Sequence, residues 1–382
     1  MILPYLAAFV AAAAAVVVPG PPGPYSVSLK VHTFTDTERL DEFAPEPENR
    51  RILTSIFLPN KKVNCSDELV DYMPPATAKA MAEVTALLGV VIPDETFLNM
   101  EMEFCKISES GGSEGGPKEK YPLLLFGPGL AASRHLYNVL GRAMASYGYV
   151  VVNMDVTYNS YLVEFPDGSV ARASPEVMSG EPALVASYVQ ARQKDISFVI
   201  DQLTDPAASA EILAGTNVDI DGSKIFAFGH SLGGNAAASA LYADERVSGA
   251  LNFDGMMLGP VTTEGVERPL ILVGRPDSPQ PDKIPSWNQT FEKLRGPGLM
   301  VGINGTQHMS FIDLDLPNMA YLPQTPEMDA FLGSIDRARL AEIIHDIVRA
   351  VLDFVFDEKT EGFCNIESFG PDVELLDIKN AC

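Results

Sequence analysis

The chain has 382 residues and a formal net charge of −24, with 46% hydrophobic and 20% charged residues. This composition is that of a globular protein and speaks against a disordered, collagen-like or coiled-coil chain. A strongly acidic surface repels phosphate backbones and anionic membranes, so we expect no nucleic-acid partner and interpret the charge as favouring solubility.

Residues 1–18 are uncharged and rich in alanine, and a Pro- and Gly-rich segment, 19–24, follows them. A short apolar run with small residues near its end is typical of a secretory signal peptide, which we place at residues 1–20. A membrane anchor is the alternative, because about 18 apolar residues can just span a bilayer. Alanine drives insertion poorly and no basic flank sets an orientation, so we expect a secreted, extracellular protein.

Four cysteines and three N-x-[ST] triplets also favour export. The cysteines are Cys65, Cys105, Cys364 and Cys382. They allow three pairings, of which we favour the local one, first with second and third with fourth. The triplets, which are acceptor sites for glycans, begin at Asn64, Asn288 and Asn304. Together these features indicate an oxidising destination rather than the cytosol.

Strand-like apolar runs alternate with helical patterns from Arg51 onward, which is typical of a mostly parallel sheet covered on both faces. The expected buried strands are 52–58, 123–126, 150–155, 225–228, 249–253, 270–273 and 299–303. The expected helices are 137–146, 183–203, 235–243, 286–294 and 337–356. No internal repeat or long linker divides the chain, so we expect one α/β domain, 21–360, and a C-terminal tail, 361–382, tied by a disulfide.

Two segments interrupt this order. The Gly-, Ser- and Glu-rich segment 108–120 is expected to form an exposed loop. Segment 75–92 has a helical pattern with apolar residues at Met81, Val84, Leu87, Leu88 and Val91. We interpret it either as a core helix or as a small cap over a lipid-binding pocket.

A G-x-S-x-G string, formed by Gly229, Ser231 and Gly233, lies between an apolar strand and an Ala-rich helix. A serine hydroxyl is a poor nucleophile until a base removes its proton and its oxygen is held clear of the backbone. The nucleophile elbow of the α/β-hydrolase fold exposes the serine on a sharp strand-to-helix turn, in which the flanking glycines leave room. The sequence therefore predicts an α/β-hydrolase fold with Ser231 as the nucleophile.

The base must be one of five histidines. His32 lies before the expected sheet, and His135 and His345 fall in helical patterns. His230 adjoins the nucleophile on the wrong side of the elbow. His308 follows the last expected strand, in the loop from which this fold takes its base, so we expect His308 to act as the base.

The carboxylate that orients the base has two candidates. Asp254 ends the strand 249–253 and precedes Gly255, which suits a tight turn. Asp277 follows the next expected strand, in a Pro-rich loop. Both lie at the carboxyl edge of the sheet, where active sites of open α/β sheets form, and the spacing alone does not decide between them.

The charge that develops on the substrate oxygen needs two backbone N–H donors. One is expected from Leu232, directly after the nucleophile, and the other from Leu130, in the Gly-rich loop after strand 123–126. This loop matches neither of the phosphate-binding patterns, GxGxxG or GxxxxGK[ST], so we expect no nucleotide cofactor. The His and Cys residues lack ligand spacing, so we expect no metal.

From about Tyr25 to Phe356 the chain resembles the platelet-activating factor acetylhydrolase family of plasma type, especially its microbial secreted relatives. The elbow is shared with many hydrolases, whereas the Asn-Phe-Asp-Gly and Gln-His-x-x-Phe strings are more specific. The resemblance rests on 127–130 with Arg134 and Tyr137, 164–168, Arg192 with Asp195, 229–234, 252–255, and 307–308 with Phe311 and Asp313. In that family the acid follows the strand after the nucleophile helix, so the resemblance favours Asp254 over Asp277.

The resemblance implies a calcium-independent esterase that releases a short acyl chain, such as acetyl, from the sn-2 position of platelet-activating-factor-like or oxidised phospholipids. It implies transient contact with a lipid surface and no obligate protein partner. Vertebrate members carry a histidine where Pro128 stands, and glycine is usual where Ala131 stands. Neither change removes a backbone donor, so both bear on acyl-chain preference rather than on catalysis.

Three alternative functions are compatible with these residues. A cutinase-like or polyester-hydrolase carboxylesterase would share the nucleophile and the base but take its acid from Asp277. An acyltransferase would form the same acyl-enzyme and pass the acyl group to an alcohol. A non-catalytic binding protein of the same fold is disfavoured, because nucleophile, base, acid and oxyanion loop are all present.

Overall fold

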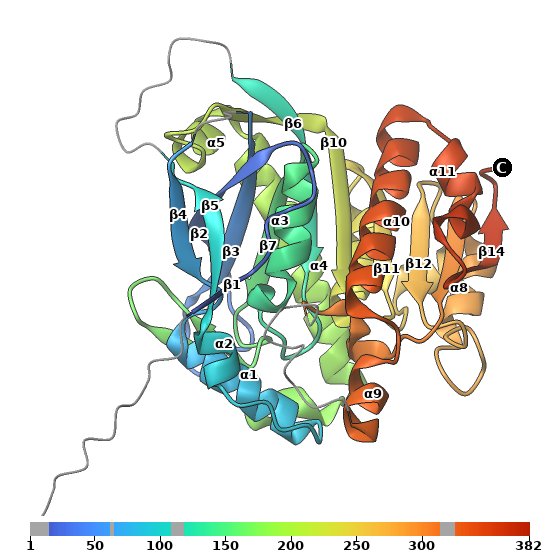
Figure 1. Ribbon diagram of the computed structural model, residues 1–382, viewed down its shortest axis with the longest axis horizontal. Helices are drawn as coiled ribbons and strands as arrows, with labels where there is room; N and C mark the ends of the chain where they lie inside the picture. Colours follow the sequence, from blue (N-terminus) through green and yellow to red (C-terminus); the bar gives the residue numbers. More distant parts are fainter. Residues whose placement is uncertain (1–14, 62–64, 108–117, 314–324) are drawn as a thin grey trace, which may run out of the picture.

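Figure 1 shows a computed structural model of the chain, which describes residues 15–61, 65–107, 118–313 and 325–382. Most of the expected signal peptide, the expected glycan acceptor Asn64, and most of the loop expected at 108–120 lie outside the described residues. Within the described ranges, no helix is both long and apolar enough to cross a membrane.

A nine-stranded sheet runs through the molecule. From edge to edge its strands are β14 (Val373–Lys379), β13 (Gly298–Ile303), β12 (Leu270–Gly274), β11 (Val247–Phe253), β10 (Val218–His230), β6 (Glu119–Gly127), β7 (Val150–Val156), β3 (Asn49–Asn60) and β2 (Ser26–Leu40). The strands from β13 to β7 pair in parallel, while β14, β3 and β2 pair antiparallel. The central strands are apolar on both sides and fully buried, as 225–228 of β10 illustrates, which is the pattern of a sheet covered on both faces.

Smaller strands flank this sheet. β1 (Val16–Val17), β5 (Met100–Cys105) and β4 (Asp67–Asp71) form a three-stranded sheet, and β8 (Leu162–Glu164) pairs with β9 (Val170–Arg172).

Helices cover both faces of the large sheet (Figure 1). On one face lie α3 (Asn138–Ser146) and α10 (Arg337–Asp357), and on the other lie α4 (Pro182–Thr204), α6 (Leu232–Ala243) and α8 (Ser286–Lys293). The further helices are α1 (Pro75–Leu87), α2 (Glu95–Leu98), α5 (Pro206–Ile212), α7 (Pro260–Glu264), α9 (Pro326–Leu332) and α11 (Glu361–Cys364). The short 3-10 helices are η1 (Arg134–Tyr137), η2 (Pro175–Ser179), η3 (His308–Phe311) and η5 (Ile366–Phe369). The predicted layered α/β architecture is confirmed.

The seven expected strands and five expected helices are all present, although the helix expected at 137–146 begins as the 3-10 turn η1. The sheet begins earlier than expected, because β2, which contains His32, pairs with β3 as an edge strand. The segment 361–382, expected as a tail, contributes β14, which pairs with β13 at the opposite edge. It is therefore continuous with the sheet.

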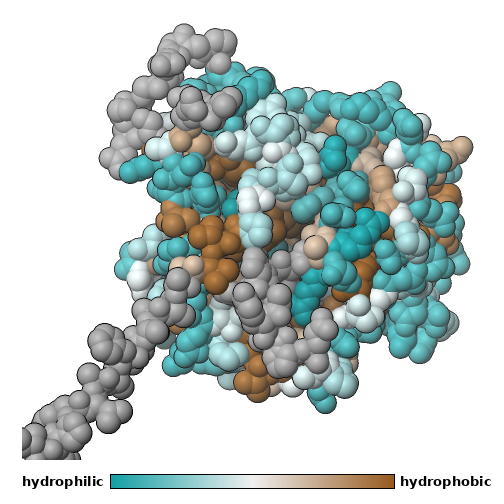
Figure 2. Space-filling model, viewed as in Figure 1, coloured by the Kyte–Doolittle hydropathy of each residue, from teal (hydrophilic) through white to brown (hydrophobic). Residues whose placement is uncertain are grey.

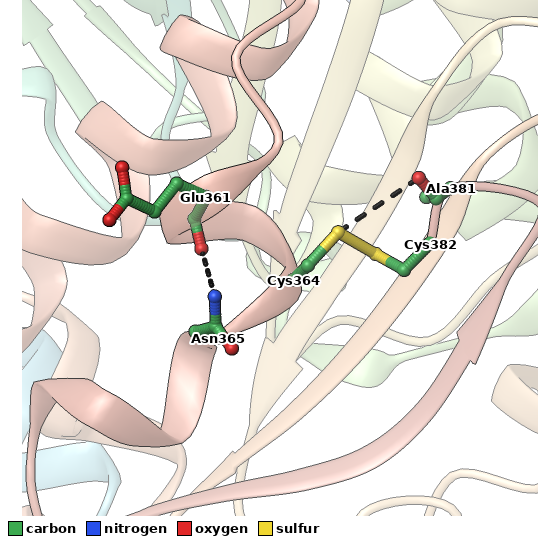
Figure 3. Close-up of a disulfide and its surroundings, with 5 residues drawn as sticks. All are labelled: Glu361, Cys364, Asn365, Ala381 and Cys382. Carbon is green, nitrogen blue, oxygen red and sulfur yellow. Dashed lines mark hydrogen bonds between the residues drawn. A yellow bond between two sulfur atoms is a disulfide. The ribbon is translucent and has the colours of Figure 1, made fainter.

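Two disulfides join Cys65 to Cys105 and Cys364 to Cys382, so the predicted local pairing is confirmed. Figure 3 shows the second, which ties α11 to the residue at the end of the chain, just after β14. Closing a loop in this way restricts the unfolded chain, so both bonds are expected to stabilise the fold.

The segment 16–24 packs onto the domain, although its first residues fall within the expected signal peptide. β1 pairs with β5, and the side chain of Val18 is only 2% exposed. The buried guanidinium of Arg142 donates hydrogen bonds to the carbonyl oxygens of Val18 and Pro19. A chain that began after residue 20 would lack all of these contacts.

A chain that begins at Pro21 is therefore expected to be about 2–3 kcal/mol less stable than one that begins at Ala15. Burial of a valine side chain contributes about 1.5–3 kcal/mol, and Arg142 would lose two acceptors while staying buried. Urea unfolding of the two chains measures the difference. Equal free energies of unfolding would mean that residues 15–20 are not part of the fold.

Candidate active site

Ser231 stands at the turn between β10 and α6. Its φ of 55° and ψ of −121° are rarely adopted by residues other than glycine, so the turn is strained. A Cβ on Gly233 would lie 2.0 Å from the carbonyl oxygen of Gly127, and a Cβ on Gly229 would lie 2.5 Å from the same atom. The two glycines of the motif are therefore required by close packing, as a nucleophile elbow demands.

His308 connects Ser231 to Asp254. Its Nε2 lies 3.1 Å from Ser231 Oγ, and its Nδ1 lies 2.8 Å from Asp254 Oδ2. Because an ionised carboxylate only accepts hydrogen bonds, Nδ1 carries the proton and Nε2 is left to accept the serine hydrogen. The structure thus brings together the residues expected as nucleophile, base and acid, from the ends of β10, β13 and β11.

The carboxylate of Asp254 is fully buried. Burial alone would raise its pKa, but the hydrogen bonds from His308 and Ser278 and the charge of Arg275 outweigh burial and leave the pKa below its ordinary value. Ser278 Oγ donates to Asp254 Oδ1 across 2.7 Å, and Arg275 Nε lies 3.2 Å from Oδ2. A carboxylate held in its charged form can fix the tautomer of the base and stabilise the imidazolium.

Asp277, the alternative acid, is not brought to His308. Its carboxylate is partly exposed and lies 3.6 Å from Lys283 Nζ in the same loop. The next residue, Ser278, is the one that points inward to Asp254. Neither Ser278 nor Arg275 is recognisable in the sequence as a site residue. Polar residues in a loop follow no pattern that separates inward-facing from outward-facing side chains.

The two expected oxyanion donors lie at the start of α6 and in the loop after β6. Among the described residues, neither the N–H of Leu130 nor that of Leu232 has a hydrogen-bond acceptor. Leu232 opens α6, where the first N–H groups of a helix have no partner within it. In the loop after β6, the N–H groups of Gly129, Ala131 and Ala132 all have acceptors, so that of Leu130 stands out. Both groups are therefore available to a negative charge that develops beside Ser231.

A cavity of about 230 Å³ opens beside Ser231, His308 and Leu130. Its other walls are largely apolar, and α1 with the segment after it supplies one side through Met81, Val84, Leu88, Ile92 and Phe97. The segment 75–92 therefore buries core residues and also lines the cavity, whereas its role as a cap over a lipid-binding pocket stays a prediction. A cavity of this kind suits an apolar group attached to the reacting carbonyl.

Exposed hydrophobic side chains lie on the outer side of the same region. Figure 2 shows a mostly hydrophilic face on which hydrophobic side chains gather near β1 and α2. The exposed large hydrophobic residues of β1, α1, α2 and their connection are Val17, Leu87, Leu88, Val91 and Leu98.

His230 lies on the core side of the elbow and is buried. Its Nε2 lies 2.9 Å from the carbonyl oxygen of His308, and its Nδ1 lies 2.9 Å from Tyr137 Oη. Because a carbonyl only accepts, Nε2 carries the proton and Nδ1 accepts from the tyrosine hydroxyl. Burial first, and then the nearby charge of His308, lowers the pKa of His230 to about 3.

Replacing His230 by Gln is expected to make stability less sensitive to acid. The unfolded chain protonates this histidine below about pH 6.5, whereas the folded chain does so only near pH 3. Because the pKa is lower in the folded chain, its contribution to stability is complete at a pH above the unfolded-state pKa and is lost as the pH falls below it. The loss is roughly 3 kcal/mol between pH 7 and pH 4. Urea unfolding at both pH values should show the wild type losing that much more stability than His230→Gln. A difference between the two proteins that does not change with pH contradicts a neutral, buried His230.

Among the described residues, the one cluster of side chains close enough to share a metal ion is Cys65, Asp67 and Cys105. Its two sulfur atoms are joined in a disulfide, which leaves no thiolate to bind a metal.

Comparison with known proteins gives one consistent family. Residues 17–169 and 209–360 match the family model described as "Platelet-activating factor acetylhydrolase, isoform II". A protein of Arthroderma benhamiae named "Probable 1-alkyl-2-acetylglycerophosphocholine esterase" is 28% identical over 384 residues, which cover 94% of this chain and 93% of that protein. The platelet-activating factor acetylhydrolase of Canis lupus familiaris is 26% identical over 219 residues, which cover 51% of this chain and 49% of the relative.

The solved structure of a ferulic acid esterase from Streptomyces cinnamoneus superposes with a TM-score of 0.78 at 23% sequence identity, covering 95% of this chain and 100% of the other. This similarity confirms the predicted α/β-hydrolase fold. The family model spans most of the chain and includes Ser231, Asp254 and His308. The chain therefore belongs to the platelet-activating factor acetylhydrolase, isoform II, family.

Proposed function

We propose that this ester hydrolase is a secreted serine esterase that removes the short sn-2 acyl group from platelet-activating-factor-like phospholipids. The observation that carries the proposal is the hydrogen-bonded chain Ser231–His308–Asp254 at an apolar cavity. These residues supply a nucleophile, a base and a charged carboxylate, so the reaction we propose uses no cofactor.

Acylation begins when Ser231 Oγ attacks the ester carbonyl carbon and His308 Nε2 takes the hydroxyl proton. The carbonyl oxygen becomes an oxyanion, which the N–H groups of Leu130 and Leu232 stabilise. Asp254 stabilises the imidazolium through Nδ1–H. When the tetrahedral intermediate collapses, the bond to the alcohol breaks and His308 returns the proton to that alcohol.

Deacylation repeats these steps with water. His308 takes a proton from the water, whose oxygen attacks the acyl carbon on Ser231. The carboxylic acid departs, and the proton held by His308 returns to Ser231 Oγ.

The substrate class and the location are supported by different observations. The relatives named above act, by their names, on 1-alkyl-2-acetylglycerophosphocholine or platelet-activating factor. Two disulfides favour an oxidising compartment, as the alanine-rich N-terminal segment does.

Rates of hydrolysis of two phosphatidylcholines, one with sn-2 acetyl and one with sn-2 oleoyl, test the substrate. We expect the acetyl ester to be cleaved at least about 10-fold faster, since a loss of about 1.4 kcal/mol in transition-state binding is enough for that ratio. Ser231→Ala is the control for background hydrolysis. Equal rates would contradict the short-acyl preference and leave a broader carboxylesterase. In a separate product analysis, transfer of the acyl group to an added alcohol in preference to water would identify an acyltransferase.

A further inference from the structure

The peptide unit before the oxyanion donor Leu130 is held at both ends by buried side chains. The carbonyl oxygen of Pro128 accepts a hydrogen bond from Arg192 Nη1, and the N–H of Gly129 donates to Tyr137 Oη across 3.2 Å. These two groups belong to one planar peptide, so two bonds fix its orientation. Arg192 also lies 3.4 Å from the carbonyl oxygen of Gly129, which belongs to the peptide that carries the N–H of Leu130.

Tyr137 joins this loop to the base. The hydroxyl of Tyr137 accepts from Gly129 and donates to Nδ1 of His230, whose Nε2–H donates to the carbonyl oxygen of His308. Donor and acceptor alternate without conflict from the oxyanion loop to the backbone of the base. Tyr137, His230 and Arg192 are each no more than 2% exposed, so water does not compete for these bonds.

None of these three side chains is needed as an acid or a base. Burial lowers the pKa of His230 to about 3, so this imidazole stays neutral where the neighbouring His308 must gain and lose a proton. Burial raises the pKa of the Tyr137 hydroxyl, which therefore keeps its proton. The chain of hydrogen bonds thus holds geometry and does not move charge.

We propose that Tyr137 and His230, with Arg192, are positioning residues. They hold the N–H of Leu130 and the backbone of His308 at fixed positions relative to Ser231. The proposal rests on the proposed function, because only an acyl-transfer site needs its oxyanion donor and its base fixed relative to one nucleophile. Pre-set donors lower the energy of the transition state without tightening substrate binding, so the unit should act on kcat.

Tyr137→Phe tests this directly, because it removes one oxygen and keeps the ring, whose centroid lies 4.5 Å from that of Phe126. We expect kcat for p-nitrophenyl acetate to fall about 10- to 100-fold, below the loss typical of a missing oxyanion donor, with KM within about twofold. Labelling of Ser231 by a fluorophosphonate should slow by a similar factor, since that reagent also places an oxygen in the oxyanion site. The control is Tyr121→Phe, which removes the hydroxyl of a tyrosine whose side chain is 6% exposed. That hydroxyl donates to Glu119 near the start of β6, at the end of the strand away from the loop that carries Leu130.

A second pair of variants keeps the test decisive if Tyr137→Phe is unstable. His230→Gln retains one side-chain donor and one acceptor and should keep most of kcat, whereas His230→Leu has neither and should lose as much as Tyr137→Phe. If His230→Leu keeps kcat within twofold of the wild type, or if its loss lies in KM, the positioning role is wrong, and the same outcome for a folded Tyr137→Phe would be a second contradiction. Failure of the proposed function would instead be seen in the wild type itself, as no turnover and no labelling of Ser231.

Discussion

Asp254→Asn is expected to lower kcat for ester hydrolysis by about 10⁴-fold, because the amide reverses the hydrogen bond that fixes the base. In the wild type, the buried carboxylate accepts from Nδ1–H of His308, which leaves Nε2 free to take the proton of Ser231. An Asn amide that turned its NH₂ group toward Nδ1 would favour the other tautomer, in which Nε2 is protonated and no longer acts as a base.

Asp277→Asn is the matched control for this substitution. The same chemical change, made 23 positions later in the chain, alters a partly exposed side chain that faces Lys283, so kcat should stay within about twofold. Steady-state kinetics of both variants with p-nitrophenyl acetate give the comparison. A large loss in Asp277→Asn with little change in Asp254→Asn would reverse the assignment of the acid and favour the cutinase-like alternative.

Val84→Phe is expected to reduce kcat/KM for p-nitrophenyl octanoate about 100-fold relative to p-nitrophenyl acetate. Val84 lines the cavity beside Ser231 and is 8% exposed, so a larger ring would fill the space that a longer acyl chain needs. Excluding three or four methylene groups at about 0.8 kcal/mol each accounts for a factor of that size. The acetyl ester needs little of this space and should be affected much less.

The control for Val84→Phe is Val91→Phe. Val91 belongs to the same segment but is 80% exposed and does not line the cavity, so the substitution should leave the ratio of the two esters unchanged. Thermal unfolding of both variants checks that overpacking has not disrupted the helix. If Val84→Phe lowers kcat/KM for both esters by the same factor, the acyl chain does not occupy the cavity. The leaving group then becomes the candidate occupant.

Much of the sheet could be predicted because its central strands are buried on both faces. Runs such as 270–273 are continuously apolar, and that pattern identifies a strand between two layers of helices. The two edge strands, β14 and β2, were missed because they lack this continuous apolar pattern. β14 mixes Glu, Asp and Lys with its apolar residues, and β2 alternates polar and apolar positions, so neither resembles a buried central strand.

The site was predictable where chain order and local motif coincide. Ser231 has the elbow motif, and His308 follows the last parallel strand, where this fold places its base. The choice between Asp254 and Asp277 could not be made from spacing, because both follow neighbouring strands that end at the same edge of the sheet. Packing separates them: the loop after β12 turns Ser278 inward and leaves Asp277 near the surface.

The contacts that hold the site in place could not be predicted at all. Tyr137 lies 93 positions from His230, and His230 lies 78 positions from His308. Such bonds depend on how η1, β10 and the loop after β13 pack together in three dimensions, and no local sequence pattern predicts that packing. The same holds for β1, because a sequence typical of a signal peptide gives no sign that it pairs with β5.

Labelling with a fluorophosphonate probe, combined with hydrolysis of p-nitrophenyl acetate by the wild type and by Ser231→Ala, tests the central claim most directly. We expect the wild type to turn over the ester and to carry the probe on Ser231, as located by mass spectrometry of its peptides, and the variant to lose both properties. Absence of turnover and of labelling in correctly folded wild-type protein would contradict the serine esterase and leave a binding protein with the same fold.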